Sequence, residues 1–413
     1  MAEVVQLRCA VQSYAWGKIG ADSAVAQLAK GDPSFVLENN KPYAELWMGT
    51  HPNGPSTICD SDGTSLSEWI YRHNGCLGNK VTEMFSGKLP FLFKVLSVNK
   101  SLSIQAHPNK HHAEQLHAAR PDIYKDPNHK PEMAIAITDY EGLCGFRPVS
   151  EIKEFLQSVP ELASVIGEQP CALLLGSNDK ASECEGIKQC FSSLMTRDEI
   201  AVTKHLSELL DRIKTMKSAE IDVTGCLGDL FLSLHGQFPG DIGCFCIYFL
   251  NHVMLKPGQA MFLGPNLPHA YLSGDCMECM ACSDNVVRAG LTPKYKDVQT
   301  LCDMLDYSPG TAEDNIFPSQ LDPEDSHVVV YDPPVKDFSV ARINLPASLS
   351  SYTVKAVEGP SILIVISGGG ETLTQQPLKL ERGAVLFMPA SVELPVKTGN
   401  EGLLVFRAYC DPK

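Results

Sequence analysis

Apolar and polar residues alternate in several short stretches of this chain. A two-residue period predicts β-strands, because successive side chains of a strand point to opposite faces. Residues 102–110 show the pattern clearly: Ser103, Gln105 and His107 fall on one face, and aliphatic residues fall on the other. The sequence therefore predicts a sheet with one polar and one apolar face in this region.

A second strand is predicted over residues 128–136. The same period puts Lys130 and Glu132 on one face, so an ammonium and a carboxylate are expected side by side. Charged groups are seldom buried without a partner or a metal ion that compensates their charge. We therefore expect this face to line a pocket that supplies such compensation.

Residues 262–271 predict a strand, a proline-containing turn and then His269 and Tyr271 on one face. A histidine before a proline, such as His107, is commonly a turn residue or a buried hydrogen-bonded side chain, so a metal site depends on the joint pattern. Nitrogen and oxygen ligands without a thiolate suit zinc, with manganese and iron as competitors. The candidate ligands are Gln105, His107, Glu132 and His269.

The hydrophobic period changes in the middle of the chain. Between residues 150 and 216, apolar residues recur at three- and four-residue spacing, the period of amphipathic helices. We predict a helical insertion over residues 149–240 and then a buried strand over residues 242–250. Shorter helices are predicted elsewhere, over residues 65–70, 110–120 and 297–305.

The C-terminal part repeats a pattern from the middle of the chain. A glycine turn followed by an apolar strand begins near Gly258 and again near Gly383. The same offset carries His269 onto Leu394. A glycine turn and a ligand-bearing strand are typical of jelly-roll barrels of the cupin type, so the second barrel is expected to lack a metal ligand.

The predicted fold class is mainly β with a helical insertion, made of two cupin-like jelly-roll barrels plus an α-helical domain. A chain of 413 residues is too long for one ordinary core. We expect residues 1–148 and 241–318 to form a catalytic jelly-roll domain, residues 149–240 to form the helical insertion domain, and residues 319–413 to form a C-terminal jelly-roll domain without metal ligands.

Composition argues against nucleic-acid and membrane partners. The formal net charge of -15 argues against a nucleic-acid surface, which needs excess Lys and Arg. No apolar run is long enough to cross a bilayer, and the N-terminus has neither a secretory nor a transit pattern. We therefore expect a cytoplasmic protein without nucleic-acid or membrane partners, whose 15 scattered cysteines are reduced thiols.

Cys276, Cys279 and Cys282 have a spacing found in metal-cluster motifs. No fourth cysteine follows them at the usual distance, and the alternation of residue types around them fits a strand. We therefore interpret residues 276–281 as a strand rather than as part of a metal cluster.

Eight stretches carry distinctive motifs along nearly the whole chain. They are YAWG (14–17), KPYAELWMGTHP (41–52), PFLFKVLS (90–97), LSIQAHPN (102–109), NHKPEM (128–133), GLCGFRP (142–148), PHAY (268–271) and DNVVRAGLTPK (284–294). In kind and order they are similar to the motifs of the type I mannose-6-phosphate isomerases. The helical insertion and the last hundred residues carry no strong motif of this family.

The resemblance implies an enzyme with one Zn²⁺ per chain that interconverts mannose 6-phosphate and fructose 6-phosphate through a cis-enediolate. It implies a phosphosugar substrate and a supply of mannose phosphate for GDP-mannose synthesis. The family's zinc ligands fall on Gln105, His107, Glu132 and His269, and its active-site arginine falls on Arg288.

Such a reaction moves a proton between C2 and C1 of the sugar, which requires a proton carrier. The sequence leaves its identity open among Glu278, Tyr271, Lys130, Asp284 and a zinc-bound water. Arg288 keeps its proton at ordinary pH, so we expect it to stabilise a negatively charged oxygen rather than to act as a base. Packing roles near the metal remain open for Tyr271 and Lys130.

Phosphate binding needs lysine, arginine or hydroxyl donors at the mouth of the pocket. The candidates are Ser103, Lys94, Arg288 and Lys294, with Asp284 as a further substrate contact. Trp16 could stack on the sugar as a pocket wall or anchor the first strand as a core aromatic.

Two other functions remain open at this stage. Barrels of this class also hold iron with two histidines and a carboxylate, so an iron oxygenase is one alternative. A non-catalytic, metal-containing cupin that binds sugars or regulates another protein is the other. The sequence does not fix the oligomeric state, and we favour a monomer.

Overall fold

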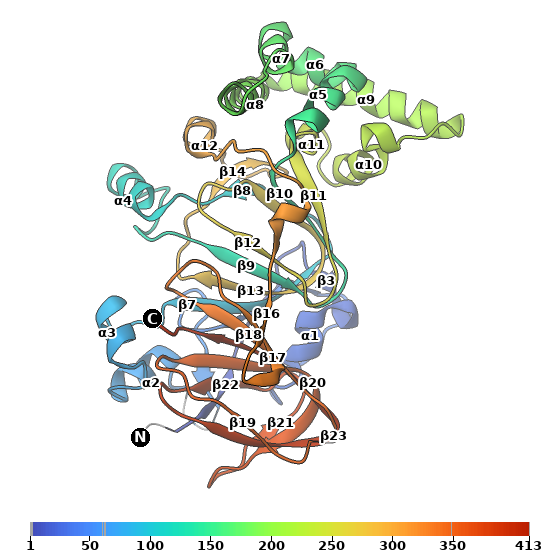
Figure 1. Ribbon diagram of the computed structural model, residues 1–413. Helices are drawn as coiled ribbons and strands as arrows, with labels where there is room; N and C mark the ends of the chain where they lie inside the picture. The colour runs from blue at the N-terminus through green and yellow to red at the C-terminus, as the bar shows by residue number, and fades with distance from the viewer. Residues whose placement is uncertain (1–2, 60, 62, 348, 413) are drawn as a thin grey trace.

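The computed structural model describes residues 3–59, 61, 63–347 and 349–412. Three parts are stacked in Figure 1: a helical region at the top, a β-barrel in the middle and a second β-barrel at the bottom. The barrels are built from two large antiparallel sheets. The predicted fold class, mainly β with a helical insertion, is confirmed.

The middle barrel is formed by strands from both sides of the helical region. They are β2 (Ala10–Gln12), β5 (Glu45–Met48), β7 (Phe91–Val98), β8 (Ile104–Ala106), β9 (Glu132–Ala136), β10 (Tyr140–Phe146), β11 (Leu250–Leu255), β12 (Ala260–Leu263), β13 (His269–Ala281), β14 (Val287–Gly290) and β15 (Ile316–Phe317). One wall has the order β15-β12-β9-β13-β7-β5-β2, and β8, β10, β11 and β14 complete the barrel. A separate pair, β3 (Lys18–Ile19) and β4 (Pro42–Tyr43), lies beside it.

Strand β13 belongs to both walls of this barrel. Its residues 269–273 pair with β8 and β10, whereas residues 274–281 pair with β7 and β9. The change of partners occurs at Gly274, whose φ of 107° lies in the region that favours glycine. A Cβ there would lie 2.5 Å from the carbonyl oxygen of Asp139, so only glycine fits this bend.

The second barrel contains the C-terminal strands and two strands from the N-terminus. They are β1 (Val5–Arg8), β6 (Thr57–Ile58), β16 (Gln320–Asp322), β17 (Asp325–Tyr331), β18 (Ser339–Leu345), β19 (Tyr352–Val354), β20 (Ser361–Thr372), β21 (Lys379–Leu380), β22 (Val385–Met388) and β23 (Leu394–Tyr409). Because β1 pairs with β22, the start of the chain is part of the second barrel's sheet. The domain boundaries expected from the sequence do not include this exchange, and they remain a prediction.

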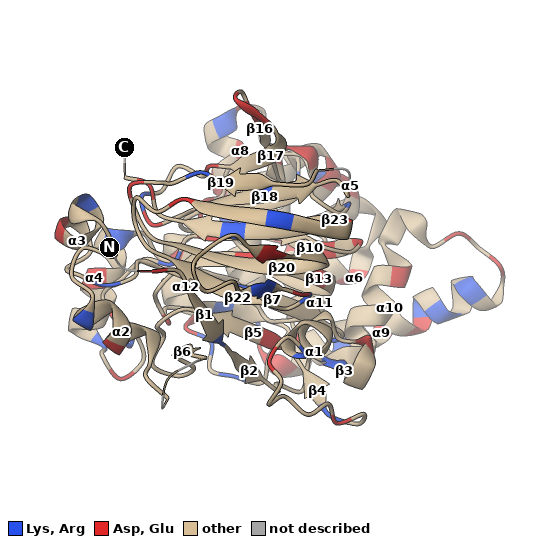
Figure 2. Cartoon of the chain, turned by 90° about the horizontal axis from the view of Figure 1, so that it is seen from below, with Lys and Arg blue, Asp and Glu red and all other residues tan. Residues whose placement is uncertain are grey.

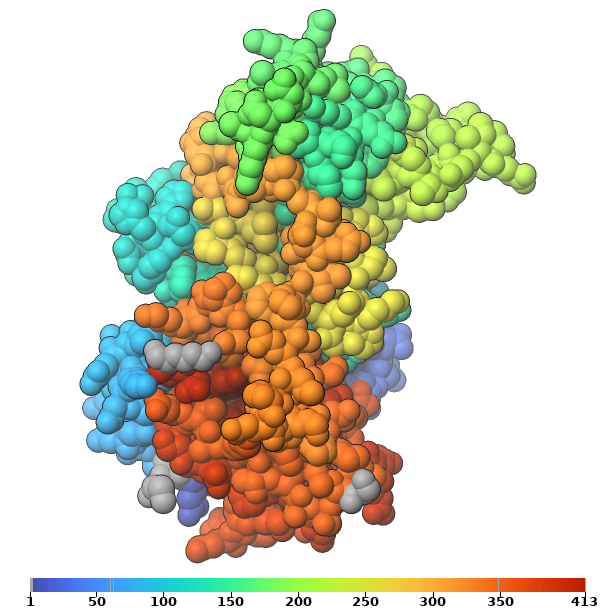
Figure 3. Space-filling model, in the orientation of Figure 1, coloured from blue at the N-terminus to red at the C-terminus, as the bar shows by residue number. Residues whose placement is uncertain are grey.

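The segment that carries α2 (Leu66–Arg72) and α3 (Asn79–Met84) also packs on the second barrel. In Figure 3 this segment, in light blue, lies against the red strands of the C-terminal part. Trp69 of α2 contacts Phe387 of β22 edge-on, with 5.6 Å between ring centroids.

The repeat predicted around two glycine turns is present in the structure. Gly258 has a φ of 86° and precedes β12, and Gly383 has a φ of 89° and precedes β22. The long strands that follow begin at His269 and at Leu394, the two positions that the offset predicts to correspond. The two barrels therefore share this part of their layout.

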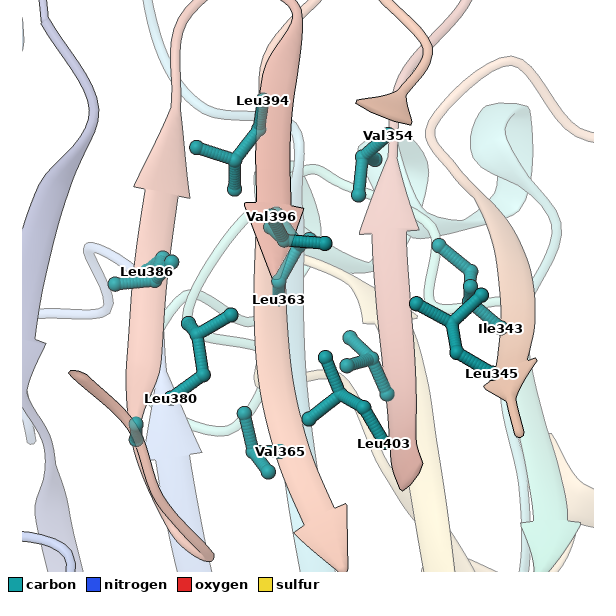
Figure 4. Close-up of a pocket in the computed structure, with 12 residues that line it drawn as sticks. Ile343, Leu345, Val354, Leu363, Val365, Leu380, Leu386, Leu394, Val396 and Leu403 are labelled. Carbon is teal, nitrogen blue, oxygen red and sulfur yellow. The ribbon is translucent and has the colours of Figure 1, made fainter. Parts of the chain in front are cut away.

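The interior of the second barrel is lined by aliphatic side chains, as Figure 4 shows. Leu394 stands in this lining at the place that corresponds to His269 in the middle barrel. The twelve lining residues offer no nitrogen, oxygen or sulfur side-chain atom to a metal: Ile343, Leu345, Val354, Leu363, Val365, Leu380, Ala384, Leu386, Leu394, Val396, Leu403 and Val405.

The helical region is formed by α5 (Val149–Ser158), α6 (Pro160–Ile166), α7 (Glu168–Leu175), α8 (Lys180–Met195), α9 (Glu199–Ser218) and α10 (Gly228–Gln237). Aspartates begin the two long helices: Asp179 accepts the Ser182 N–H at 3.0 Å, and Asp198 accepts the Ala201 N–H at 2.9 Å. Such N-caps satisfy amide groups that the first helical turn leaves unpaired. The predicted helical insertion is confirmed.

The prediction of one buried strand over residues 242–250 is wrong over its first part. Residues Gly243–Cys246 form the short helix α11, and β11 begins only at Leu250. Phe245 and Phe249 are fully buried, as predicted. A short, uniformly apolar run satisfies a buried helix as well as a buried strand, so its period could not decide between them.

The three shorter helices predicted from the sequence are present as α2, α4 (Lys110–Ala119) and α12 (Val298–Met304). Each is capped by the side chain just before it. Ser65 accepts the Glu68 N–H at 3.2 Å, and Asn109 and Asp297 cap α4 and α12 in the same manner. A further short helix, α1 (Ala24–Ala29), covers the end of β7.

One apolar cluster joins the two barrels. The middle barrel contributes Phe93, Val95, Met133, Ile135 and Met277, and the second barrel contributes Ile362, Ile364, Phe387, Phe406 and Ala408. Strands β7, β9 and β13 therefore present one face to the second barrel and leave the alternate face for the interior of the middle barrel.

Helix α9 projects from the side of the molecule in Figure 2, where lysines, arginines, aspartates and glutamates are mixed along it. Among the described residues, we find no helix that is both long and apolar enough to cross a membrane.

Replacing Phe387 by alanine should destabilise the fold. Its ring is fully buried between the barrels, and such a truncation removes about 3–5 kcal/mol. Urea denaturation of the F387A variant measures this loss. Leu321→Ala in β16 is the control, because that leucine is 61% exposed and its removal should change stability by less than about 0.5 kcal/mol. Equal effects of the two variants would contradict the described interface.

Candidate metal centre

Three buried side chains converge inside the middle barrel. The Oε2 atom of Glu132 lies 3.3 Å from Nε2 of His107 and 3.4 Å from Nε2 of His269. None of these three atoms has a hydrogen-bond partner, although all three are shielded from solvent. Unpartnered buried polar atoms are costly unless something compensates them. A divalent cation fits this place, because two nitrogens and a carboxylate oxygen lie within 4.8 Å of one another.

The outer nitrogen of each histidine is already engaged. Nδ1–H of His107 donates to the carbonyl oxygen of Asn285 at 2.6 Å, and Nδ1–H of His269 donates to that of Leu267 at 2.9 Å. Such bonds fix the ring and leave the lone pair of Nε2 directed inward. Burial, followed by the charge of Lys130, lowers the pKa of His107 to about 4, so its imidazole is neutral.

Glu132 is the first residue of β9 and stands between β12 and β13. One carboxylate oxygen accepts a hydrogen bond from Nζ of Lys130, and the other turns toward the histidines. Burial alone raises the pKa of this carboxyl group, but the charge of Lys130 and the contact with His107 outweigh it. The pKa therefore lies well below its usual value, and Glu132 is ionised.

Gln105 lies in β8 directly opposite His269 on one side and Arg288 on the other. Directly opposed residues of antiparallel strands project from the same face. Gln105 therefore projects from the same face of the sheet as His269, and its side chain is half-buried. Its role as the fourth ligand remains a prediction.

A second set of polar side chains lies farther along β13. The hydroxyl of Tyr271 donates to Oε1 of Glu278 at 2.8 Å, and Oε2 of Glu278 lies 3.0 Å from Nζ of Lys94. Burial raises the pKa of Glu278, more than Lys94 lowers it. Burial alone would lower the pKa of Lys94, but Glu278 and Glu45 outweigh it and raise that pKa.

Lys94 therefore forms ion pairs with carboxylates inside the barrel. Its second partner is Glu45, 3.3 Å away, which also accepts a hydrogen bond from the indole N–H of Trp47 at 2.5 Å. This network directs Lys94 into the interior of the middle barrel. Its role as a phosphate ligand remains a prediction, and the two carboxylates beside it make that role less favourable.

Arg288 and Asp284 are two further candidates from the sequence. Arg288 is half-buried, and burial lowers the pKa of its guanidinium. No ion pair of Arg288 is present in the part of the chain that the structure describes. Asp284 is exposed and lies 3.3 Å from Nε2 of His51, which holds its pKa below the usual value.

Trp16, Ser103 and Lys294 are the other candidate substrate contacts. Trp16 is half-buried, stacks on Tyr14 with 6.0 Å between centroids, and packs against the cluster that contains Tyr271. Ser103 is half-buried, whereas Lys294 is exposed. Their contacts with a substrate remain predictions.

The sequence did not identify Glu45, Trp47, His51 and Asn285 as parts of the site. Glu45 and Trp47 alternate along residues 44–49, so their shared face was visible in the sequence. The strand opposite them was not, because the pairing of β5 with β7 is a tertiary contact. Asn285 acts through its main-chain carbonyl, which leaves no signal in the type of residue.

Comparisons with known proteins identify the family of this chain. Three family models match: "Phosphomannose isomerase type I, catalytic domain" over residues 4–149, "Phosphomannose isomerase type I, helical insertion domain" over residues 165–250 and "Phosphomannose isomerase type I C-terminal" over residues 329–373.

Two curated relatives are named mannose-6-phosphate isomerase. The protein of Bos taurus is 51% identical and that of Homo sapiens is 50% identical, each over 98% of both chains. A crystal structure of mannose 6-phosphate isomerase from Salmonella typhimurium, bound to fructose 6-phosphate and zinc, is 31% identical. It covers 99% of this chain and 100% of its own, with a TM-score of 0.84.

Replacing His269 by alanine should abolish stable metal binding. The change removes one of the three converging ligand atoms. We expect less than about a tenth of the wild-type metal content after incubation with Zn²⁺ and desalting, measured by mass spectrometry of the metal. His111→Ala is the control, since His111 is exposed on α4. Equal metal content in both variants would contradict the assigned centre.

Proposed function

The chain belongs to the type I phosphomannose isomerase family, and from that premise we propose that it interconverts mannose 6-phosphate and fructose 6-phosphate at the His107–Glu132–His269 centre. It is an aldose–ketose isomerase that uses one Zn²⁺. The observation that carries the assignment of the site is the convergence of three unpartnered, buried ligand atoms.

We assign zinc binding to His107, Glu132 and His269, with Gln105 as the fourth ligand. When bound, the metal polarises the sugar carbonyl and offsets the negative charge that develops on oxygen. Glu132 is the sole carboxylate among the ligands, so a bound divalent ion would keep a net positive charge. An anionic sugar intermediate is favoured in such a place.

We assign proton transfer to Glu278, assisted by Tyr271. A carboxylate that takes the proton from C2 and returns it to C1 needs a pKa near the working pH. Burial moves the pKa of Glu278 in that direction. Asp284 is less suited, because it is exposed and its pKa is lowered, and Lys130 is committed to Glu132.

We assign the stabilisation of negative charge on the substrate to Arg288. Its guanidinium is half-buried beside Gln105 and has no carboxylate partner among the described ion pairs. A desolvated guanidinium without a partner binds oxyanions strongly and in a fixed orientation. We place Ser103 and Lys294 with it as phosphate contacts, Asp284 as a substrate contact and Trp16 as a wall of the sugar pocket.

We further propose that the protein acts in the cytoplasm and supplies mannose 6-phosphate for GDP-mannose synthesis. Buried thiols such as Cys144 and Cys276 have a raised pKa because of burial, which suits a protein that keeps its cysteines reduced. Its partner is then a phosphosugar, and we propose that the chain works as a monomer.

Nuclear magnetic resonance of the protein with mannose 6-phosphate in deuterated water tests the function. Fructose 6-phosphate should appear only when zinc is present, with deuterium at the position that receives the proton. Conversion that requires iron and oxygen would favour the oxygenase alternative. Sugar binding without conversion under any metal would favour a non-catalytic barrel and overturn the proposal.

Replacing Glu278 by glutamine should abolish proton transfer while sparing the fold. We expect kcat to fall about 10²–10⁴-fold with little change in KM, measured by a coupled assay for fructose 6-phosphate. The matched control is Glu141→Gln, because Glu141 pairs with His252 in the neighbouring strand β11 and takes no part in the site. A variant E278Q with normal kcat would remove Glu278 from this role.

Replacing Arg288 by alanine should lower kcat/KM about 10²–10³-fold, because one donor to a developing charge is lost. Arg288→Lys keeps the positive charge without the planar fork and should recover only part of that loss. Arg72→Ala serves as the control, since Arg72 is an exposed residue of α2 paired with Glu68. Full activity of R288A would contradict the assignment.

A further inference from the structure

The segment that delivers Lys130 and Glu132 to the metal centre is only partly held by a sheet. Strand β9 begins at Glu132, and just before it the carbonyl oxygen of Pro131 accepts a hydrogen bond from the Ala281 N–H of β13 at 3.2 Å. On the side of the middle barrel, Nδ2 of Asn128 donates to the carbonyl oxygen of Cys282 at 3.0 Å. The position of Lys130 therefore depends on individual contacts of its neighbours.

One such contact comes from the other barrel. Nε2 of His129 lies 3.1 Å from Oδ2 and 3.3 Å from Oδ1 of Asp337. Asp337 lies between β17 and β18, and its side chain is only 6% exposed. A buried carboxylate needs such a partner, because an isolated buried charge is strongly unfavourable. Separating His129 from Asp337 would therefore be unfavourable.

The alternation of side chains links this pair to the site. Lys130 and Glu132 point into the middle barrel and contact each other. Met133, on the opposite face of β9, belongs to the apolar cluster that joins the two barrels. His129 contacts the second barrel from that same side, so one short segment faces the metal centre and the second barrel at once.

We propose that His129 and Asp337 are positioning residues, through which the C-terminal barrel holds Lys130 and Glu132 in place for metal binding. The second barrel, whose own interior is aliphatic, then contributes to the metal centre of the first. The pair touches neither metal nor substrate. This inference rests on the proposed function for the identity of the metal.

The test is the rate at which zinc leaves the protein in the presence of a chromogenic chelator. His129→Ala should accelerate zinc release about tenfold, in the range found when outer contacts of metal ligands are lost. His129→Gln keeps a side-chain N–H donor and should restore most of the wild-type rate. If His129 only stabilised the fold, H129A and H129Q variants with equal melting temperatures would release zinc at equal rates.

The chain offers a closely matched control. His327 lies 3.2 Å from Asp325 within the second barrel, with side-chain exposures of 32% and 11%, against 24% and 6% for His129 and Asp337. His327→Ala should leave zinc release unchanged. An equal acceleration in this variant would mean that any damage to the second barrel loosens the metal, and would overturn the proposal.

A second variant tests the pair from the other side. Asp337→Ala should accelerate zinc release, and combining it with His129→Ala should add little, because both changes remove one interaction. Additive effects, or release at the wild-type rate in the H129A variant, would refute the pair's role. Because His129 is partly exposed, H129A keeps the test decisive if D337A does not fold.

The assay separates this inference from the proposed function. Wild-type protein that retains zinc but produces no fructose 6-phosphate would contradict the isomerase assignment alone, since zinc release still reports on the pair. Normal isomerase activity with unchanged zinc release in every variant would contradict the positioning role alone.

Discussion

The alternation of side chains along β7, β9 and β13 is the constraint on which the rest of the molecule depends. One face of these strands carries Lys94, Glu132 and Glu278 into the middle barrel, and the other packs against the second barrel. A shift of register by one residue would exchange the two faces and bury charges in the apolar interface. The bend at Gly274 lets β13 serve both walls while the alternation is kept.

Charge compensation explains why the polar face can be buried. Lys130 is matched to Glu132, and Lys94 is shared by Glu45 and Glu278. Three carboxylates thus face two ammonium groups. The Nε2 atoms of His107 and His269 nearby have no hydrogen-bond partner. A divalent cation would offset the excess negative charge of this set, at the place where Glu132, His107 and His269 bring together ligand atoms without hydrogen-bond partners.

The two barrels show how one layout serves two purposes. Corresponding glycine turns lead into corresponding strands, yet His269 has Leu394 as its counterpart. With aliphatic side chains the second barrel buries its interior without any compensating ion. Its remaining task is external: it covers the apolar face of the middle barrel and, through Asp337, reaches the segment next to the metal centre.

The sequence by itself determined the fold class, the helical insertion and the repeat, because each depends on a local period or turn that residue types express directly. It also identified His107, Glu132 and His269, since their alternation and the motifs around them are visible in the sequence. Only the tertiary structure decided that β1 joins the second barrel, that residues 243–246 are helical, and that Glu45 and His129 contact Lys94 and Asp337. These features depend on pairings between distant segments, whose geometry no local pattern encodes.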